Sequence, residues 1–181
     1  MISIRNSVLV VIDVQGKLAQ LMHSPDYLPA LKAVIKAAQL LEIPTVLTEQ
    51  APGKIGSTIP EVRELLKDQP PIVKQTFSCW GEEQFVNTIT SLCRNEIIIV
   101  GIESHVCVYQ TVRDLLRRNY HVHLVTDAVS SRAVHNAKMG IERCEKEGAV
   151  LTTTEMIITE LIESTRHSKF REIMALLKES K

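Results

Sequence analysis

The chain has 181 residues, and its 21 Lys and Arg balance its 21 Asp and Glu, so the formal net charge at pH 7 is zero. Hydrophobic residues make up 45% of it, with only seven Gly and seven Pro, which excludes disordered, collagen-like and low-complexity chains. This length suits a single domain, residues 1–181, with one sizeable core. A neutral chain without a basic block is not expected to bind nucleic acid or an acidic membrane by bulk electrostatics.

Short apolar runs alternate with segments of helical periodicity along the whole chain. The first run, Val8–Ile12, is β-branched and ends at Asp13. Similar runs predict strands at 45–48, 72–74, 97–100, 122–125 and 149–151. Helices are expected at about 31–41, 61–67, 85–93, 108–116, 134–144, 155–163 and 170–177. Residues 51–60 contain two Gly and two Pro, which predicts a long loop.

The predicted strands are hydrophobic along their length rather than alternating. Such strands are typical of a parallel sheet with helices on both faces. Aromatic residues make up only 4% of the chain, so aliphatic side chains must fill the core. We therefore predict an α/β protein of three layers (α/β/α), doubly wound around a six-stranded, mostly parallel, Rossmann-like sheet.

The four cysteines, at positions 79, 93, 107 and 144, show no C-x-x-C or zinc-finger spacing. Neither a disulfide framework nor a structural metal is expected, and Cys93 and Cys144 are expected in the core. The first residues lack the pattern of a secretory signal, and no apolar run approaches the ~20 residues of a membrane span. These features predict a cytoplasmic protein with free thiols, no cofactor and no membrane partner.

Reactive side chains directly follow three of the predicted strands. Asp13 follows the first strand, Lys74 ends the third, and Cys107 lies in the first helical turn after the fourth. In doubly wound sheets, ligands bind beyond the carboxyl ends of the strands. We therefore expect a carboxylate, an amine and a thiol to meet at one edge of the sheet.

These three groups suit nucleophilic catalysis. A helix N-terminus and a nearby lysine lower the pKa of a thiol, and an aspartate can take its proton and return it to a leaving group. Free N–H groups of the same turn can hold an oxyanion. Taken singly, Asp13 could cap a turn, Lys74 could lie on the surface and Cys107 could be a small buried residue. Their shared location favours a functional site.

Several motifs give the chain a familial resemblance. They are Val10–Gln15, Ile72–Lys74 with Phe77–Ser78, Gly101–Val108 and Thr126–Arg132. Together they make the chain similar to the isochorismatase-like cysteine hydrolases, over about 8–163. Thr48–Gln50 before the loop most resembles the branch of the isochorismatase domain-containing proteins.

The resemblance implies an isochorismatase-like fold and a catalytic triad of Asp13, Lys74 and Cys107. It also implies a cis peptide bond between Ile102 and Glu103, an oxyanion hole made by the N–H groups of Glu103 and Cys107, and a homo-oligomer (dimer, tetramer or larger). Nicotinamidases of this family bind a metal through an Asp-x-His motif and a further histidine. This chain has no histidine between His23 and His105, so no metal is expected and nicotinamide is a disfavoured substrate.

Four further residues are candidates for contact with a small-molecule substrate: Gln15, Phe77, Trp80 and His105. Gln15 could instead bond the adjacent loop, Trp80 could pack, and His105 could be structural. We expect hydrolysis of a small amide through a cysteine thioester. The alternatives are hydrolysis of a vinyl ether, as in isochorismatases, and a non-catalytic oligomer that keeps the pocket to sense a ligand or redox state.

Overall fold

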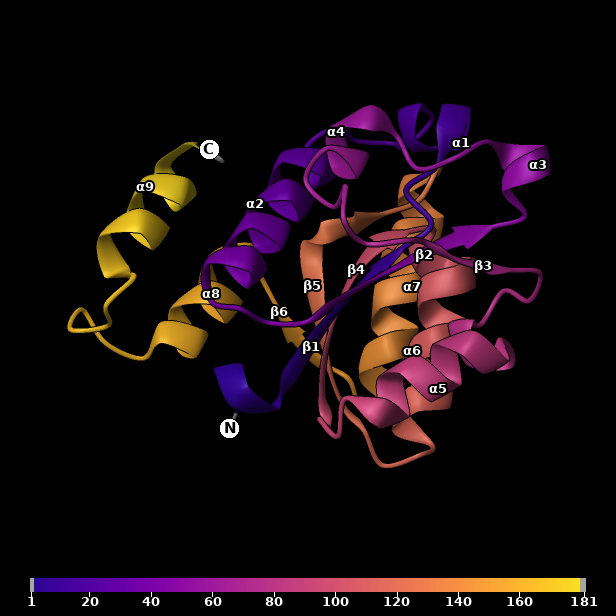
Figure 1. The fold of residues 1–181 in the computed structure, drawn as a ribbon. Helices are drawn as coiled ribbons and strands as arrows, with labels where there is room; N and C mark the ends of the chain where they lie inside the picture. Colours follow the sequence, from indigo (N-terminus) through magenta and orange to yellow (C-terminus); the bar gives the residue numbers. More distant parts are fainter. Residues whose placement is uncertain (1, 180–181) are drawn as a thin grey trace.

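The computed structural model describes residues 2–179 and contains one six-stranded sheet, all of whose strands are parallel. Its order is β3-β2-β1-β4-β5-β6, so the chain starts in the middle and winds outward in both directions (Figure 1). The strands are β1 (Ser7–Ile12), β2 (Thr45–Gln50), β3 (Ile72–Lys74), β4 (Glu96–Ile102), β5 (His121–Ser130) and β6 (Val150–Thr152). The predicted fold class is confirmed.

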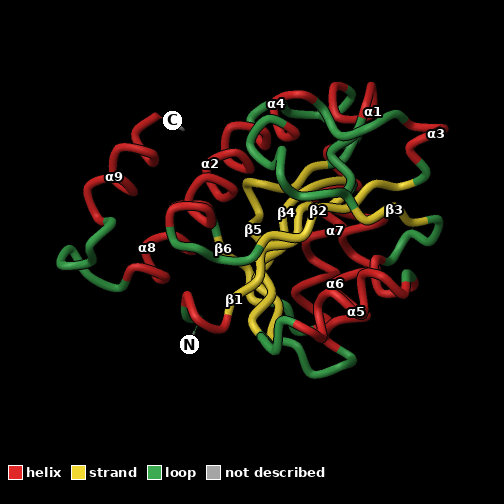
Figure 2. The backbone as a smooth tube through the Cα atoms, viewed as in Figure 1, coloured by secondary structure: helices red, strands yellow, loops and turns green. Residues whose placement is uncertain are grey.

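Helices cover both faces of the sheet (Figures 1 and 2). On one face lie α2 (Tyr27–Leu40), α8 (Thr154–Ile162) and α9 (Phe170–Glu179), and on the other α5 (Glu83–Ser91), α6 (Tyr109–Leu116) and α7 (Val134–Glu147). Three short helices lie near the carboxyl ends of the first strands: α1 (Gly16–Gln20), α3 (Pro52–Ile55) and α4 (Pro60–Arg63). No helix within residues 2–179 is long and apolar enough to cross a membrane.

Strand β1 shows why the strands are continuous apolar runs. Successive side chains point to opposite faces, so Leu9 and Val11 enter the core beneath α2 while Val8, Val10 and Ile12 enter the core beneath α5 and α6. All five are fully buried. Because both faces are covered, every position of the strand must be apolar, and the first polar side chain, Asp13, marks the carboxyl edge.

The structure corrects three local expectations. The predicted loop at 51–60 contains α3 and the start of α4. Strand β5 extends to Ser130, with a register shift against β4 between Ile99 and Gly101. Cys93 is exposed rather than part of the core, because it follows the end of α5 at a positive φ of 51°. Cys144 is buried, as expected.

Candidate functional site

Asp13 and Lys74 form a buried ion pair at the carboxyl edge of the sheet. Asp13 directly follows β1, and Lys74 is the last residue of β3. Lys74 Nζ lies 2.6 Å from Asp13 Oδ2, and the two residues are only 1% and 3% exposed. Burial by itself would lower the pKa of Lys74, but the charge of Asp13 and the neighbouring thiols outweigh it, so the pKa of the ammonium is raised. Lys74 is therefore a cation in the resting protein.

Strand β2, which lies between β1 and β3, orients both members of this pair. Thr48 Oγ1 donates a hydrogen bond of 2.7 Å to Asp13 Oδ1, and Lys74 Nζ donates one of 2.8 Å to Gln50 Oε1. The lysine also donates to the carbonyl oxygens of Thr76 (3.2 Å) and Phe77 (3.1 Å). Sequence reasoning missed Thr48 and Gln50, although their spacing of two residues on one strand places them on the same face.

Cys107 approaches the pair from the other side of β1. It lies in a π-helical turn, Ser104–Val108, that follows β4 and leads into α6, and it is 7% exposed. Its thiol is close enough to Asp13 for that carboxylate to raise the pKa of the thiol. Gly140 of α7 packs directly against the turn, since a Cβ there would lie 2.6 Å from the carbonyl carbon of Ser104. The structure thus brings the three predicted side chains together.

The pKa of the Cys107 thiol differs from the sequence-based expectation. Burial raises it, and so do the negative charge of Asp13 and the hydrogen bond to it, whereas Lys74 lowers it only in part. The expected lowering by a helix N-terminus and a lysine is therefore wrong for the resting protein. The resting thiol is therefore protonated.

A second buried thiol, Cys79, adjoins the same site. Its Sγ lies 3.8 Å from Thr48 Oγ1, and its backbone N–H donates a 3.0 Å bond to Thr111 Oγ1 of α6. Burial is the main reason that the pKa of Cys79 is raised to about 11. Cys79 is thus a protonated thiol that packs behind Thr48.

Glu103 opens the turn that carries Cys107, and the Ile102–Glu103 peptide bond is cis. The carboxylate of Glu103 accepts hydrogen bonds from two groups of Arg132, the backbone N–H (3.1 Å) and the side-chain Nε–H (3.0 Å). The carbonyl of Glu103 accepts from the N–H groups of Val106 (3.0 Å) and Val108 (3.3 Å). The turn is therefore tied at its start to the segment that follows β5.

The sequence profile described as the isochorismatase domain matches residues 7–156, most of the chain. Isochorismatase domain-containing protein 2 of Homo sapiens is 36% identical over 180 residues, which cover 96% of this chain and 84% of that protein. The chain belongs to the isochorismatase family. The resemblance found in the sequence motifs is confirmed.

Two solved structures share the whole fold of this chain. The MAR1 ribonuclease of Caenorhabditis elegans superposes with a TM-score of 0.91 at 38% identity, over 98% of this chain and 92% of that one. The YcaC protein of Escherichia coli is described as an octameric hydrolase of unknown specificity. It superposes with a TM-score of 0.87 over 99% of this chain and 97% of that one. At 23% identity, YcaC supports the fold alone.

Gln15 forms hydrogen bonds with the loop that follows β2. Its fully buried side chain accepts a 2.6 Å bond from Gln50 N and donates to the carbonyls of Gln50 (3.1 Å) and Gly56 (2.6 Å). Its amide groups are thus bound to main chain, which supports the alternative that Gln15 bonds the adjacent loop. In this isochorismatase-family chain, Gln15 connects β1, the end of β2 and the loop after it.

Trp80 likewise packs rather than lining the site. Its ring centroid lies 5.6 Å from that of Tyr120 and 6.4 Å from that of Phe85, and the guanidinium of Arg118 lies 4.8 Å from it. Tyr120 directly precedes β5, so the indole extends towards the amino ends of the strands. These contacts support the alternative that Trp80 packs.

His105 and Phe77 have different surroundings. His105 Nδ1 lies 2.9 Å from Ser131 Oγ, which lies 2.7 Å from Ser104 Oγ. This network supports the structural alternative for His105. The carbonyl oxygen of Phe77 accepts the hydrogen bond from Lys74 Nζ, and the Phe77 side chain is 55% exposed. Its ring therefore remains a candidate for substrate contact.

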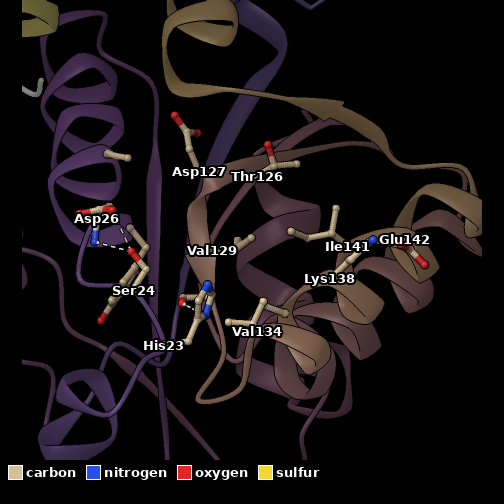
Figure 3. Close-up of a pocket in the computed structure, with 14 residues that line it drawn as sticks. His23, Ser24, Asp26, Thr126, Asp127, Val129, Val134, Lys138, Ile141 and Glu142 are labelled. Carbon is tan, nitrogen blue, oxygen red and sulfur yellow. Dashed lines mark hydrogen bonds and ion pairs between the residues drawn. The ribbon is translucent and has the colours of Figure 1, made fainter.

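A cavity of about 680 Å³ lies between the start of α2 and α7 (Figure 3). His23 lines it, and His23 Nδ1 lies 2.9 Å from the carbonyl oxygen of Ser131 and 3.2 Å from Ser130 Oγ. None of the three triad candidates lines this cavity. Within residues 2–179, no three His, Cys, Asp or Glu side chains are grouped so as to hold a metal ion.

Proposed function

We propose that this protein is a cysteine-dependent hydrolase that cleaves the C–N bond of a small amide through a thioester on Cys107. The observation that carries the proposal is the buried Asp13–Lys74 ion pair beside the Cys107 thiol, whose pKa the Asp13 carboxylate raises. Buried ion pairs contribute little net stability, so packing gives no reason for this one. A nucleophile held beside an oriented base gives a functional reason for the ion pair.

In the first half of the reaction, Asp13 takes the thiol proton while Cys107 Sγ attacks the carbonyl carbon of the amide. The C=O bond opens to an oxyanion, which the N–H groups of Glu103 and Cys107 would receive. The oxyanion then collapses, the C–N bond breaks, and Asp13 returns the proton to the departing nitrogen. The ammonium of Lys74 stabilises the carboxylate and the thiolate character that develops on sulfur.

In the second half, the ionised Asp13 takes a proton from water, and the resulting hydroxide attacks the thioester carbonyl. The C–S bond breaks, a carboxylic acid leaves, and Asp13 returns the proton to Cys107 Sγ. No group other than the triad has to change its protonation state. The raised pKa of Cys107 fits this cycle, because the thiol starts and ends it protonated.

A screen of small amides and vinyl ethers against the wild type and Cys107→Ala tests the proposal. Cys144→Ala is the matched control, since it removes another buried thiol that lies outside the site. We expect amide turnover by the wild type and Cys144→Ala, none by Cys107→Ala, and a covalent acyl adduct on Cys107 by mass spectrometry. Turnover of vinyl ethers that survives in Cys107→Ala would favour the isochorismatase-type reaction instead. A Cys107-dependent mass shift with hydrogen peroxide and no turnover of any substrate would favour the sensing role.

The ribonuclease name of one relative adds RNA to this screen. The neutral composition of this chain gives no net positive charge to attract a phosphate backbone, so no nucleic-acid partner is proposed. RNA cleavage that is lost in Cys107→Ala would overturn that part of the proposal.

We also infer a homo-oligomer in the cytoplasm. The resemblance carried by the sequence motifs supports the assembly, and the free thiols support a reducing compartment. Light scattering coupled to size-exclusion chromatography tests the assembly, because a mass of 20.3 kDa would indicate a monomer.

A further inference from the structure

The guanidinium of Arg132 binds the carboxylate of Glu103 at the start of the turn that carries Cys107. It donates from Nε to Glu103 Oε1 (3.0 Å) and from Nη2 to Oε2 (3.3 Å). Such a bidentate pair fixes the plane of the carboxylate as well as its position. The backbone N–H of Arg132 adds a third bond, of 3.1 Å, to Oε1. The Glu103 side chain is therefore held in one orientation by a single residue from outside the turn.

Ser131, the residue before Arg132, binds the next two residues of the same turn. Its Oγ lies 2.7 Å from Ser104 Oγ and 2.9 Å from His105 Nδ1. Ser131 and Ser104 are both fully buried. Two consecutive residues after β5 thus bind three consecutive residues, 103–105, and together they fix the start of the turn.

The exposure of Arg132 indicates that its ion pair contributes little to the stability of the fold. The Arg132 side chain is 58% exposed, whereas that of Glu103 is 7% exposed. Ion pairs with an exposed partner add little to the free energy of unfolding, because water screens the charges. The pair still restricts geometry, and the residue that it restricts supplies one of the two N–H groups of the proposed oxyanion hole.

We propose that Arg132 is a positioning residue of the hydrolase, which acts through the Glu103 carboxylate to aim the Glu103 N–H group at the oxyanion. This inference rests on the proposed function, because it requires that Cys107 attacks a carbonyl group. When Sγ forms its bond to carbon, an electron pair of the C=O bond moves to oxygen, and the N–H groups stabilise the resulting charge. A small displacement of a donor from this position costs much of the rate.

Two reactions of the Cys107 thiol separate this role from a general effect on the fold. Acylation by 4-nitrophenyl acetate passes through an oxyanion, whereas alkylation by iodoacetamide displaces iodide from a saturated carbon and forms none. Burial and Asp13 raise the pKa of this thiol and Lys74 opposes them, so removal of the Arg132 charge should leave alkylation unchanged. Mass spectrometry of the labelled protein measures both rates. We expect Arg132→Gln to be acylated about tenfold more slowly than the wild type and alkylated equally fast.

Arg113→Gln is the matched control, because it removes another arginine that pairs with a carboxylate, that of Asp114 on α6. This variant should be acylated at the wild-type rate. Glu103→Gln should slow acylation as Arg132→Gln does, and the double variant should be little slower than either single variant, since the arginine acts through that carboxylate. The anionic ester 4-nitrophenyl succinate should lose the same factor as the neutral acetate.

Equal acylation of the wild type and Arg132→Gln would overturn this inference and leave the proposed hydrolase in place. Acylation and alkylation that fall together would overturn it too, because they would indicate a disturbed turn, as would additive losses in the double variant. A loss confined to the anionic ester would mean that Arg132 binds the substrate itself. Absence of any Cys107-dependent acylation in the wild type would instead contradict the proposed function, and the inference would fail with it.

Discussion

Thr48 donates its hydroxyl hydrogen to Asp13 Oδ1 at 2.7 Å, and both side chains are buried. Since Lys74 holds the other carboxylate oxygen, Asp13 is fixed from two neighbouring strands before any substrate arrives. Fixed orientation of a catalytic base is worth a large part of an enzymatic barrier. Thr48 is therefore the residue through which β2 acts on the proposed chemistry.

Replacement of Thr48 tests that role. Thr48→Val keeps the shape but removes the donor to Asp13, so we expect a loss of about 1–3 kcal/mol in the free energy of unfolding and a lower kcat/KM for any amide found in the screen. Thr48→Ser restores the hydroxyl and should recover most of both. Urea unfolding and steady-state kinetics measure them. A Val variant as stable and active as the Ser variant would contradict the assignment.

Removal of the Lys74 charge should be more damaging. Lys74→Met has similar length, but it leaves the Asp13 carboxylate buried without its cation, which typically costs about 3–5 kcal/mol. Lys67→Met, at an exposed position, should change stability by less than about 0.5 kcal/mol. Denaturant unfolding of the two variants gives the comparison. Similar stabilities would mean that the ion pair is not formed in solution.

Gln15 should control the loop after β2 because its amide bonds main-chain groups of Gln50 and Gly56. In Gln15→Ala we expect faster amide hydrogen exchange at Gln50 and across 52–56, together with a loss of about 2–3 kcal/mol in stability. Gln20→Ala, on the exposed side of α1, is the control. Unchanged exchange at Gln50 would rule out this role.

Gly140 should be needed for the position of the Cys107 turn. A Cβ at this position would meet the backbone of Ser104 and His105 at 2.6–2.7 Å, and backbone cannot move aside as a flexible side chain can. Gly140→Ala should therefore destabilise the protein by about 1–3 kcal/mol and lower activity. Gly53→Ala, where a Cβ meets nothing within 4 Å, should do neither. Thermal unfolding distinguishes them.

Buried thiols should make the protein less stable at alkaline pH. Burial raises the pKa of Cys79 to about 11 and that of Cys144 to about 12, whereas cysteines of the unfolded chain ionise near pH 8.5. Between those values the folded state binds more protons than the unfolded state, so the free energy of unfolding falls as pH rises, by about 1.4 kcal/mol per unit for each thiol. Below about pH 8 this contribution is fully present.

Urea unfolding between pH 8 and 11 measures that slope. Cys144→Ala should make it shallower, and replacement of the exposed Cys93 by alanine should leave it unchanged. A slope in Cys144→Ala as steep as in the wild type would show that this thiol already ionises in the folded protein.

Much of the architecture can be predicted from local patterns. Continuous apolar runs are possible only where a strand is buried on both faces, so the run at 8–12 already implies a covered parallel sheet. The same rule places the first polar residue after such a run at the carboxyl edge, which is how Asp13 and Lys74 are found. Cys107 follows because the next strand also leads into a helix at that edge.

Other features depend on contacts between distant segments. Gln15 ends one of the motifs and Trp80 lies near another. The Gln15 amide bonds main-chain groups of Gln50 and Gly56, and the Trp80 ring packs against Tyr120, so the partners lie 35 to 41 residues away. The pKa of Cys107 rises rather than falls because burial and Asp13 outweigh Lys74, a balance that only three-dimensional distances determine.

Local periodicity and short motifs were thus enough to predict the order of strands and helices along the chain, the edge that carries the reactive groups and the family to which the chain belongs. Contacts between distant segments were needed to show that Thr48 and Gln50 orient the ion pair and that the resting thiol is protonated. The physical reason is that hydrogen bonding, desolvation and charge depend on which side chains meet in space, and strand order brings together residues that no local pattern connects.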